Sequence, residues 1–188
     1  AVQHHQNNQF DTARQMYQQL LSIDPNQPDA LHLYGLSLHQ SGNSLDAESF
    51  IRRAVTTSPD NQIYLLNFCS VLKKLGKFDE AAVHYRKILS INPAHVEAWY
   101  GLGNVLRNLG NIPEAIEAYR QAVSVNPKYA DAYINLGVAL SAQGKTEESL
   151  DAYRRAIEAD PNRPELHYNM GTIYQGQKRL NDAIACFQ

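Results

Sequence analysis

Residues 96–129 read VEAWYGLGNVLRNLGNIPEAIEAYRQAVSVNPKY, and this stretch decides the fold. Trp99, Leu102, Leu106 and Leu109 recur at spacings of three and four residues, which predicts a helix with one apolar face. Gly110 follows, and glycine suits the left-handed residue that ends a helix. The first half of the stretch is therefore a predicted helix that stops at a tight turn.

A second helix is predicted directly after this turn. Pro113 suits its first turn, where the missing N–H is not needed, and Ile116 and Tyr119 begin its buried stripe. Asn126 and Pro127 are expected to end it. The stretch is thus a pair of helices, called the A helix and the B helix below.

The same pattern returns every 34 residues along the whole chain. If each recurring proline is position 32 of its repeat, this position holds Pro25, Pro59, Pro93, Pro127 and Pro161. Position 8 is small, with Gly35, Cys69, Gly103, Gly137 and Gly171, and position 15 is glycine at 42, 76, 110 and 144. Position 20 is Ala13, Ala47, Ala81, Ala115, Ser149 and Ala183, whereas position 24 is large: Tyr17, Ile51, Tyr85, Tyr119, Tyr153 and Phe187. Glycine inside a helix is unfavourable, so the glycines of position 8 need a reason. We expect the reason to be close approach of the paired helix at the alanine of position 20.

One such unit cannot bury its apolar face alone, so neighbouring units must stack. The predicted fold class is an all-α, right-handed α-solenoid of stacked antiparallel helix pairs. We expect a single array over residues 1–188, with a partial repeat at 1–27, repeats at 28–61, 62–95, 96–129 and 130–163, and a partial repeat at 164–188.

Composition excludes several classes of protein. The chain has 188 residues, of which 44% are hydrophobic and 19% charged, so it can bury a core. A net charge of −2 lacks the basic surface of a nucleic-acid binder, and no run approaches the roughly 18 apolar residues of a membrane span. Nucleic acid is not an expected partner, and we predict a cytoplasmic protein without a membrane span.

No motif indicates catalysis, a cofactor or a metal within this chain. Phosphate-binding, dinucleotide-binding and nucleophile-elbow motifs are absent, and the carboxylate pairs 79–80 and 147–148 fit the first turn of a B helix, where negative charge is favourable. Cys69 and Cys186 show no CxxC spacing and are interpreted as structural thiols. The adjacent His4 and His5 would point to different sides of a helix, and His32 and His39, seven residues apart, have no third ligand candidate beside them.

The repeat resembles the tetratricopeptide repeat family. Residues 96–129 carry its pattern of Trp, Leu, Gly, Ala, Tyr, Ala and Pro almost complete, as Trp99, Leu102, Gly103, Ala115, Tyr119, Ala122 and Pro127. The family implies a scaffold that binds other proteins, with positions 2, 5, 6, 9, 12 and 13 of the A helices lining a concave groove. The groove residues that this implies are Asn67, Ser70, Lys73, Lys74, Tyr100, Asn104, Arg107, Asn108, Asn135, Tyr168 and Asn169.

An extended, partly acidic peptide of another protein is the predicted ligand of this groove. Asparagine amides can both donate to and accept from a peptide backbone, and Lys73, Lys74 and Arg107 attract carboxylates. The alternative is that these asparagines are merely common in the family and that the lysines serve solubility. Leu33 and Gly101 interrupt position 6, so the family's clamp for chaperone C-termini is not predicted.

A narrower resemblance leaves a second function open. Residues 110–120 and 129–136 are similar to repeats of O-GlcNAc transferase-like enzymes, in which such repeats recruit substrate proteins. The alternative function is therefore the substrate-recruiting arm of a larger glycosyltransferase whose catalytic domain lies outside this chain. Neither end carries a polar capping helix, so we expect a fragment of a longer polypeptide, or self-association through the uncapped ends.

Overall fold

The computed structural model describes residues 10–187, and in this part the chain forms eleven α-helices and no strand. His4 and His5 lie outside the described residues. The chain divides into two compact units, Ala1–Pro93 and Ala94–Gln188. The predicted single array is not tested by this division and stays a prediction.

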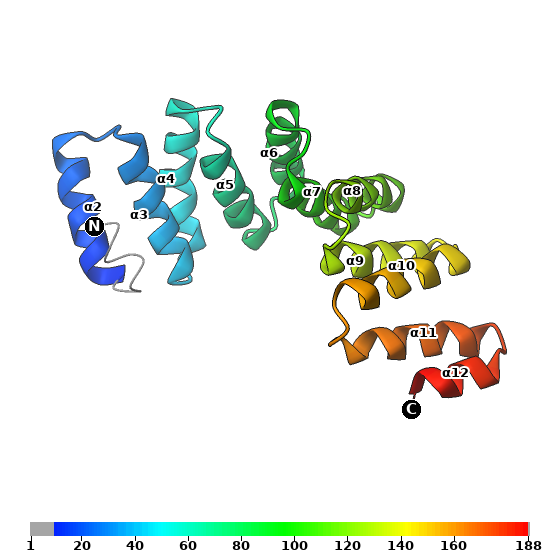
Figure 1. The fold of residues 1–188 in the computed structure, drawn as a ribbon. Helices are drawn as coiled ribbons and strands as arrows, with labels where there is room; N and C mark the ends of the chain where they lie inside the picture. Colours follow the sequence, from blue (N-terminus) through cyan, green and yellow to red (C-terminus); the bar gives the residue numbers. More distant parts are fainter. Residues whose placement is uncertain (1–9, 188) are drawn as a thin grey trace. The chain divides into compact units, whose positions relative to one another are not determined.

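Unit 1, the part before residue 94, contains two complete helix pairs and one further B helix. Its helices are α2 (Phe10–Ile23), α3 (Pro28–Gln40), α4 (Ser44–Thr57), α5 (Gln62–Lys74) and α6 (Phe78–Ile91). The A helices α3 and α5 each run antiparallel to the B helix that follows (Figure 1).

Unit 2 contains three helix pairs built on the same plan. Its A helices are α7 (Val96–Asn108), α9 (Ala130–Ala142) and α11 (Pro164–Gly176), and its B helices are α8 (Ile112–Val125), α10 (Thr146–Ala159) and α12 (Leu180–Phe187). Each A helix packs on the B helix after it, and α8 and α10 also contact the A helix of the next repeat (Figure 1).

The turn chemistry confirms the predicted helix ends. Gly42, Gly76, Gly110 and Gly144 all adopt positive φ between the A and B helices of a repeat, at 72–89°. Lys178 holds this place in the last repeat at φ 60°, the only described non-glycine residue with positive φ. Each recurring proline follows the last residue of a B helix by two, since Pro cannot continue a helix.

The small side chains of position 8 are needed for a reason different from the one expected. A Cβ on Gly103 or Gly137 would lie 2.5 or 2.7 Å from the ring of Tyr119 or Tyr153, at position 24 of the paired helix. Position 20 also comes close: the Ala47 carbonyl would lie 3.0 Å from a Cβ on Gly35, and the Ser149 hydroxyl donates to the Gly137 carbonyl at 2.7 Å. The prediction of close approach was right, but the large residue of position 24 is what the glycine accommodates.

The core follows the predicted alternation. All six side chains of position 20 are buried, and those of position 24 are buried except for Phe187, which is half exposed. Cys69 is fully buried, and burial raises the pKa of its thiol to about 12. Both cysteines are free thiols, and the buried one fits the structural role predicted for it.

No helix in the described part of the chain is long and apolar enough to cross a bilayer.

Candidate functional site

The A helices of unit 1 are linked through polar side chains on one side. Asn67 of α5 donates its amide Nδ2 to Nε2 of His32 on α3 over 2.9 Å, and the His32 ring stacks on Tyr64, with ring centres 4.5 Å apart. Two turns further along α3, Nε2 of His39 lies 3.3 Å from the hydroxyl oxygen of Ser70. Two of the predicted groove residues of unit 1, Asn67 and Ser70, therefore lie between neighbouring A helices.

The two predicted lysines of α5 have different environments. Lys73 is half-buried, with its Nζ 5.9 Å from the ring centre of Tyr85, and burial lowers the pKa of this lysine. Lys74, the last residue of α5, is exposed. An anion that approaches this end of α5 therefore meets Lys74 in solvent, whereas the Lys73 ammonium already faces an aromatic ring.

A cluster of predicted residues forms in unit 2. The carboxamide oxygen of Asn104 on α7 accepts hydrogen bonds from the Tyr119 hydroxyl at 2.8 Å and from Asn135 Nδ2 at 2.9 Å. Asn135 Nδ2, on α9, also donates to the Tyr100 hydroxyl at 3.1 Å. We call Tyr100, Asn104, Tyr119 and Asn135 the amide cluster. Sequence analysis placed Tyr119 only in the core and missed its role in orienting Asn104.

These contacts fix which way each amide faces. Both N–H groups of Asn135 and the oxygen of Asn104 are used inside the amide cluster. The Asn104 NH₂ group and the Asn135 oxygen make no hydrogen bond with another described residue, and both side chains are half-buried rather than enclosed. The cluster thus has one donor and one acceptor left over, the pair that a peptide C=O and N–H complement.

Three further residues border the amide cluster in sequence or space. Arg107 is half-buried one turn after Asn104, and its charge lowers the pKa of Tyr119 against the dominant effect of burial, which raises it to about 12. Asn108 is exposed and donates to the Asn104 backbone oxygen at 2.7 Å. Burial likewise raises the pKa of Tyr129, whose ring packs edge-on against Tyr100, to about 12.

The last two predicted groove residues lie apart from this cluster. Tyr168 of α11 is 66% exposed, and its ring centre lies 5.8 Å from that of Phe187. Asn169 is half-buried and forms no hydrogen bond with the amide cluster in the part of the chain that the structure describes. The structure therefore brings Tyr100, Asn104 and Asn135 together but not Tyr168 and Asn169.

A spacing of 35 residues marks the contacts between neighbouring A helices. It joins Asn67 to His32, Asn135 to Tyr100, and the Tyr64 hydroxyl to the Asp29 carboxylate that accepts from it. This spacing is one repeat plus one residue, so the residues that it pairs can be read directly from the sequence. Sequence analysis aligned equal positions only, and so it missed His32 as the partner of Asn67.

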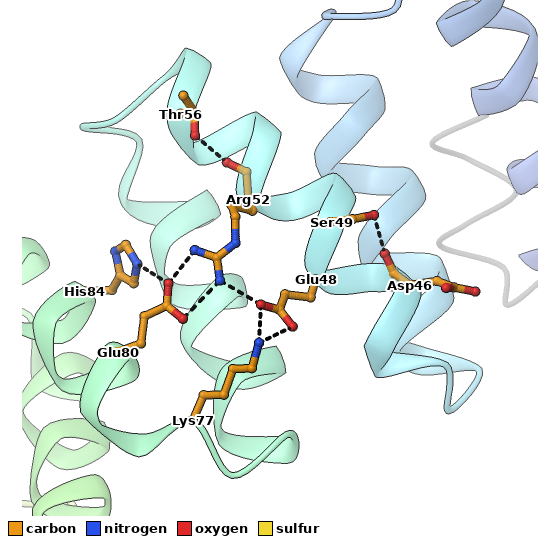
Figure 2. Close-up of polar contacts among 8 residues, drawn as sticks. All are labelled: Asp46, Glu48, Ser49, Arg52, Thr56, Lys77, Glu80 and His84. Atoms are coloured by element: carbon orange, nitrogen blue, oxygen red, sulfur yellow. Dashed lines mark hydrogen bonds and ion pairs between the residues drawn. The ribbon is translucent and has the colours of Figure 1, made fainter.

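Between the B helices, charged residues pair in a second pattern. Arg52 of α4 donates to Glu80 of α6 and to Glu48, which also accepts from Lys77 (Figure 2). In unit 2, Arg120 of α8 donates to Glu148 of α10 at 2.7 Å. Glu80 and Glu148 lie in the first turn of a B helix, as predicted, and each also forms an ion pair with the preceding B helix. No group of three potential metal ligands occurs within residues 10–187.

Comparisons with known proteins agree with this architecture. One family model of the tetratricopeptide repeat matches residues 70–123 and 102–164. A second model with the same description matches residues 152–185. A model of the anaphase-promoting complex, cyclosome, subunit 3 matches residues 6–88. The first model alone covers half of the chain, so the chain belongs to the tetratricopeptide repeat family, and the predicted α-solenoid class is confirmed.

Solved structures show the same fold at low sequence identity. A crystal structure of MamA is 24% identical, with 81% of this chain and 90% of that chain covered and a TM-score of 0.78. MamA from residue 41 to its end, from Desulfovibrio magneticus RS-1, is 20% identical over 93% and 91%, with a TM-score of 0.76. YrrB, described as a TPR protein with an unusual peptide-binding site, is 19% identical over 90% and 88%, with a TM-score of 0.75.

At these identities the likeness concerns the fold alone. A comparison with curated protein sequences found no match. Family membership and fold together support a protein-interaction scaffold, and no catalytic domain is evident in the described residues.

Proposed function

We propose that the chain binds an extended peptide segment of another protein along its A helices, and that Asn104 and Asn135 hold the peptide backbone. The observation that carries this proposal is the pairing of an unused amide donor on Asn104 with an unused acceptor on Asn135. A hydrogen-bonding pair held in place by its own contacts binds without a large ordering cost.

Charge supports an acidic element in the ligand. Arg107 lies one turn from Asn104 and forms no ion pair with another described residue, and Lys74 is exposed at the end of α5. A guanidinium can bind a carboxylate through two parallel hydrogen bonds. In this proposal the side-chain amides of Asn104 and Asn135 bind the peptide backbone and so position the peptide in unit 2. Arg107 then selects acidic side chains near this point.

The test uses a displayed library of random twelve-residue peptides, selected on the intact chain. The strongest binder is resynthesised with single backbone N-methyl groups, and its affinity is measured by calorimetry. We expect one N-methyl position to weaken binding about tenfold, since a lost hydrogen bond of about 1.4 kcal/mol corresponds to that factor. Asn104→Ala and Asn135→Ala should each weaken the parent peptide similarly.

The matched control is Asn162→Ala, in an exposed loop of the same unit, which should leave the affinity unchanged. Trp99 fluorescence checks that α7 keeps its packing in every variant. If all N-methylated peptides bind as tightly as the parent, backbone recognition by the amide cluster is wrong.

The alternative, a substrate-recruiting arm of a glycosyltransferase, would use the same A-helix surface and stays a prediction that this binding test also serves. A cytoplasmic site of action is proposed because both cysteines are free thiols, which a reducing compartment maintains.

A further inference from the structure

Equivalent positions on the B-helix side of the two units differ in size. Arg52, Phe68, Glu80 and His84 of unit 1 lie two repeats, or 68 residues, before Arg120, Leu136, Glu148 and Ala152 of unit 2. The arginine and glutamate are the same in both units. The phenylalanine and histidine are replaced by the smaller leucine and alanine.

In unit 1 these side chains fill the space between α4, α5 and α6. Arg52 donates to both oxygens of Glu80 (Figure 2). The guanidinium carbon of Arg52 lies 4.9 Å from the ring centre of Phe68. The His84 ring packs edge-on against Phe68, with ring centres 5.0 Å apart, and its Nε2 lies 3.9 Å from Glu80 Oε1. An imidazole thus occupies the place between the apolar ring and the carboxylate.

In unit 2 the same place is hollow. Arg120 still donates to Glu148, but a hollow of about 430 Å³ opens beside Leu136, Leu140 and Ala152. This volume lies in the range of pockets that hold a ligand, roughly 300–1,000 Å³. The hollow is bounded by α8, α9 and α10, so it is formed entirely within unit 2.

The groups around the hollow indicate what would fit. Leu136, Leu140 and Ala152 give an apolar floor, which suits a flat ring, and Tyr133, which stands where unit 1 has Leu65, also lines the hollow. Oε1 of Glu148 and the carboxylate of Asp151 form no hydrogen bond with another described residue, whereas in unit 1 Glu80 Oε1 faces the histidine. Glu147 also lines the hollow, but its Oε1 accepts from Gln177 and lies 3.9 Å from Arg179, so Glu148 and Asp151 are the carboxylates that make the rim favour an N–H donor over an anion.

We propose that this hollow binds the imidazole ring of a histidine presented by a partner protein, in the place that His84 occupies in unit 1. The ring lies on Leu136 and Ala152 and donates an N–H to Glu148 Oε1. The hollow is lined by residues of α9 and of the B helices and by none of the amide cluster, so this contact goes beyond the proposed peptide groove and can fail independently of it.

The first experiment titrates N-acetyl-histidine methylamide into the intact chain and follows methyl NMR signals of Leu136, Leu140 and Ala152. We expect saturable shifts at these methyls, and binding at least about tenfold weaker for the capped alanine and capped phenylalanine probes. Absence of saturable shifts overturns the proposal. Equal binding of capped phenylalanine refutes the N–H contact, and equal binding of free imidazole refutes recognition of a partner's histidine.

Three variants test where the ring binds and what it contacts. Ala152→His supplies the ring from within, as in unit 1, and should abolish binding of the capped histidine, whereas Glu148→Gln keeps the shape and should weaken it about tenfold. Conversely, His84→Ala should open an equivalent hollow in unit 1, and added imidazole should restore the lost hydrogen-exchange protection of α6. If Ala152→His binds the probe as tightly as the wild type, the proposed location is wrong.

Discussion

Unit 1 and unit 2 build the same repeat, yet their B helices are joined in different ways. In unit 1, Arg52 bridges Glu48 and Glu80, and Lys77 completes a chain of alternating charges (Figure 2). The rings of Phe68 and His84 pack against each other beside this chain. In unit 2, Arg120 contacts Glu117 and Glu148 beside an open hollow. The repeated positions of the 34-residue period determine which helices pack together. The side chains at the other positions decide whether the space between neighbouring B helices is filled or left open.

The largest effect is expected at position 8 of two A helices, α5 of unit 1, which has Cys69, and α7 of unit 2, which has Gly103. A Cβ at Gly103 would lie 2.5 Å from the fully buried ring of Tyr119. We predict that Gly103→Cys destabilises unit 2 by about 3 kcal/mol, at the upper end of overpacking costs, and breaks the Tyr119–Asn104 hydrogen bond. Denaturant unfolding followed by Trp99 fluorescence measures the change.

The reciprocal control is Cys69→Gly in unit 1, which introduces a helical glycine and a small void. Its cost should be about 1–2 kcal/mol, measured by hydrogen exchange of the α5 amides. Equal costs for the two substitutions would show that the spacing of the helix pairs does not differ between the units.

A smaller contrast should appear when each arginine is replaced by methionine. Arg52→Met leaves Glu80 and the well-buried Glu48 with fewer partners, although Lys77 still reaches Glu48. Because the Arg52 side chain is 44% exposed, we reduce the expected loss for solvent screening to about 1–2 kcal/mol. Arg120→Met should cost about 0.5 kcal/mol or less, as expected for exposed pairs.

Hydrogen exchange of α4 and α6, compared with α8 and α10, separates these two losses. A Glu80→Gln variant completes a double-mutant cycle with Arg52→Met and isolates the pair itself. Identical losses in both units would mean that the extended network in unit 1 adds nothing to a single ion pair.

The fold was predictable because its determinants are local and repeated. Pro127 and Gly110 end helices by their own backbone chemistry, and their counterparts elsewhere do the same. The reason for Gly103 was less accessible, because the sequence shows that a residue is small but not which neighbour it accommodates. The ring of Tyr119 reaches further than the Cβ of Ala115, so the large residue makes the contact.

The candidate site was predictable only in part. The amides Asn104 and Asn135 were identified from their positions on the A helices, but their orientation depends on Tyr119, a residue of another helix. The hollow near Ala152 depends on two small side chains from different helices that meet only after folding. A pattern that aligns equal positions cannot reveal contacts that cross from one position to another.

A further small effect is a pH dependence of stability in unit 1, which comes from His84. Burial is the main cause that lowers the pKa of His84, so the folded state holds the imidazole neutral. Below about pH 6.5 the unfolded chain binds a proton that the folded chain takes up only at lower pH, so stability is lost as pH falls. Between about pH 7 and 5.5 this loss should be below about 1 kcal/mol.

Urea unfolding of wild type and His84→Gln at both pH values, with hydrogen exchange of α6, measures that contribution. The variant should lose part of the pH dependence but not all of it, because burial and the nearby Lys74 also lower the pKa of His39 in the same unit. Ala152 offers no titrating group at the equivalent place, so α10 provides the internal reference. If the pH dependence of hydrogen-exchange protection in α6 is unchanged by His84→Gln, the His84 ring accepts a proton as readily in the folded state as in the unfolded chain. The space between the B helices of unit 1 would then be less closed than the packing of His84 on Phe68 indicates.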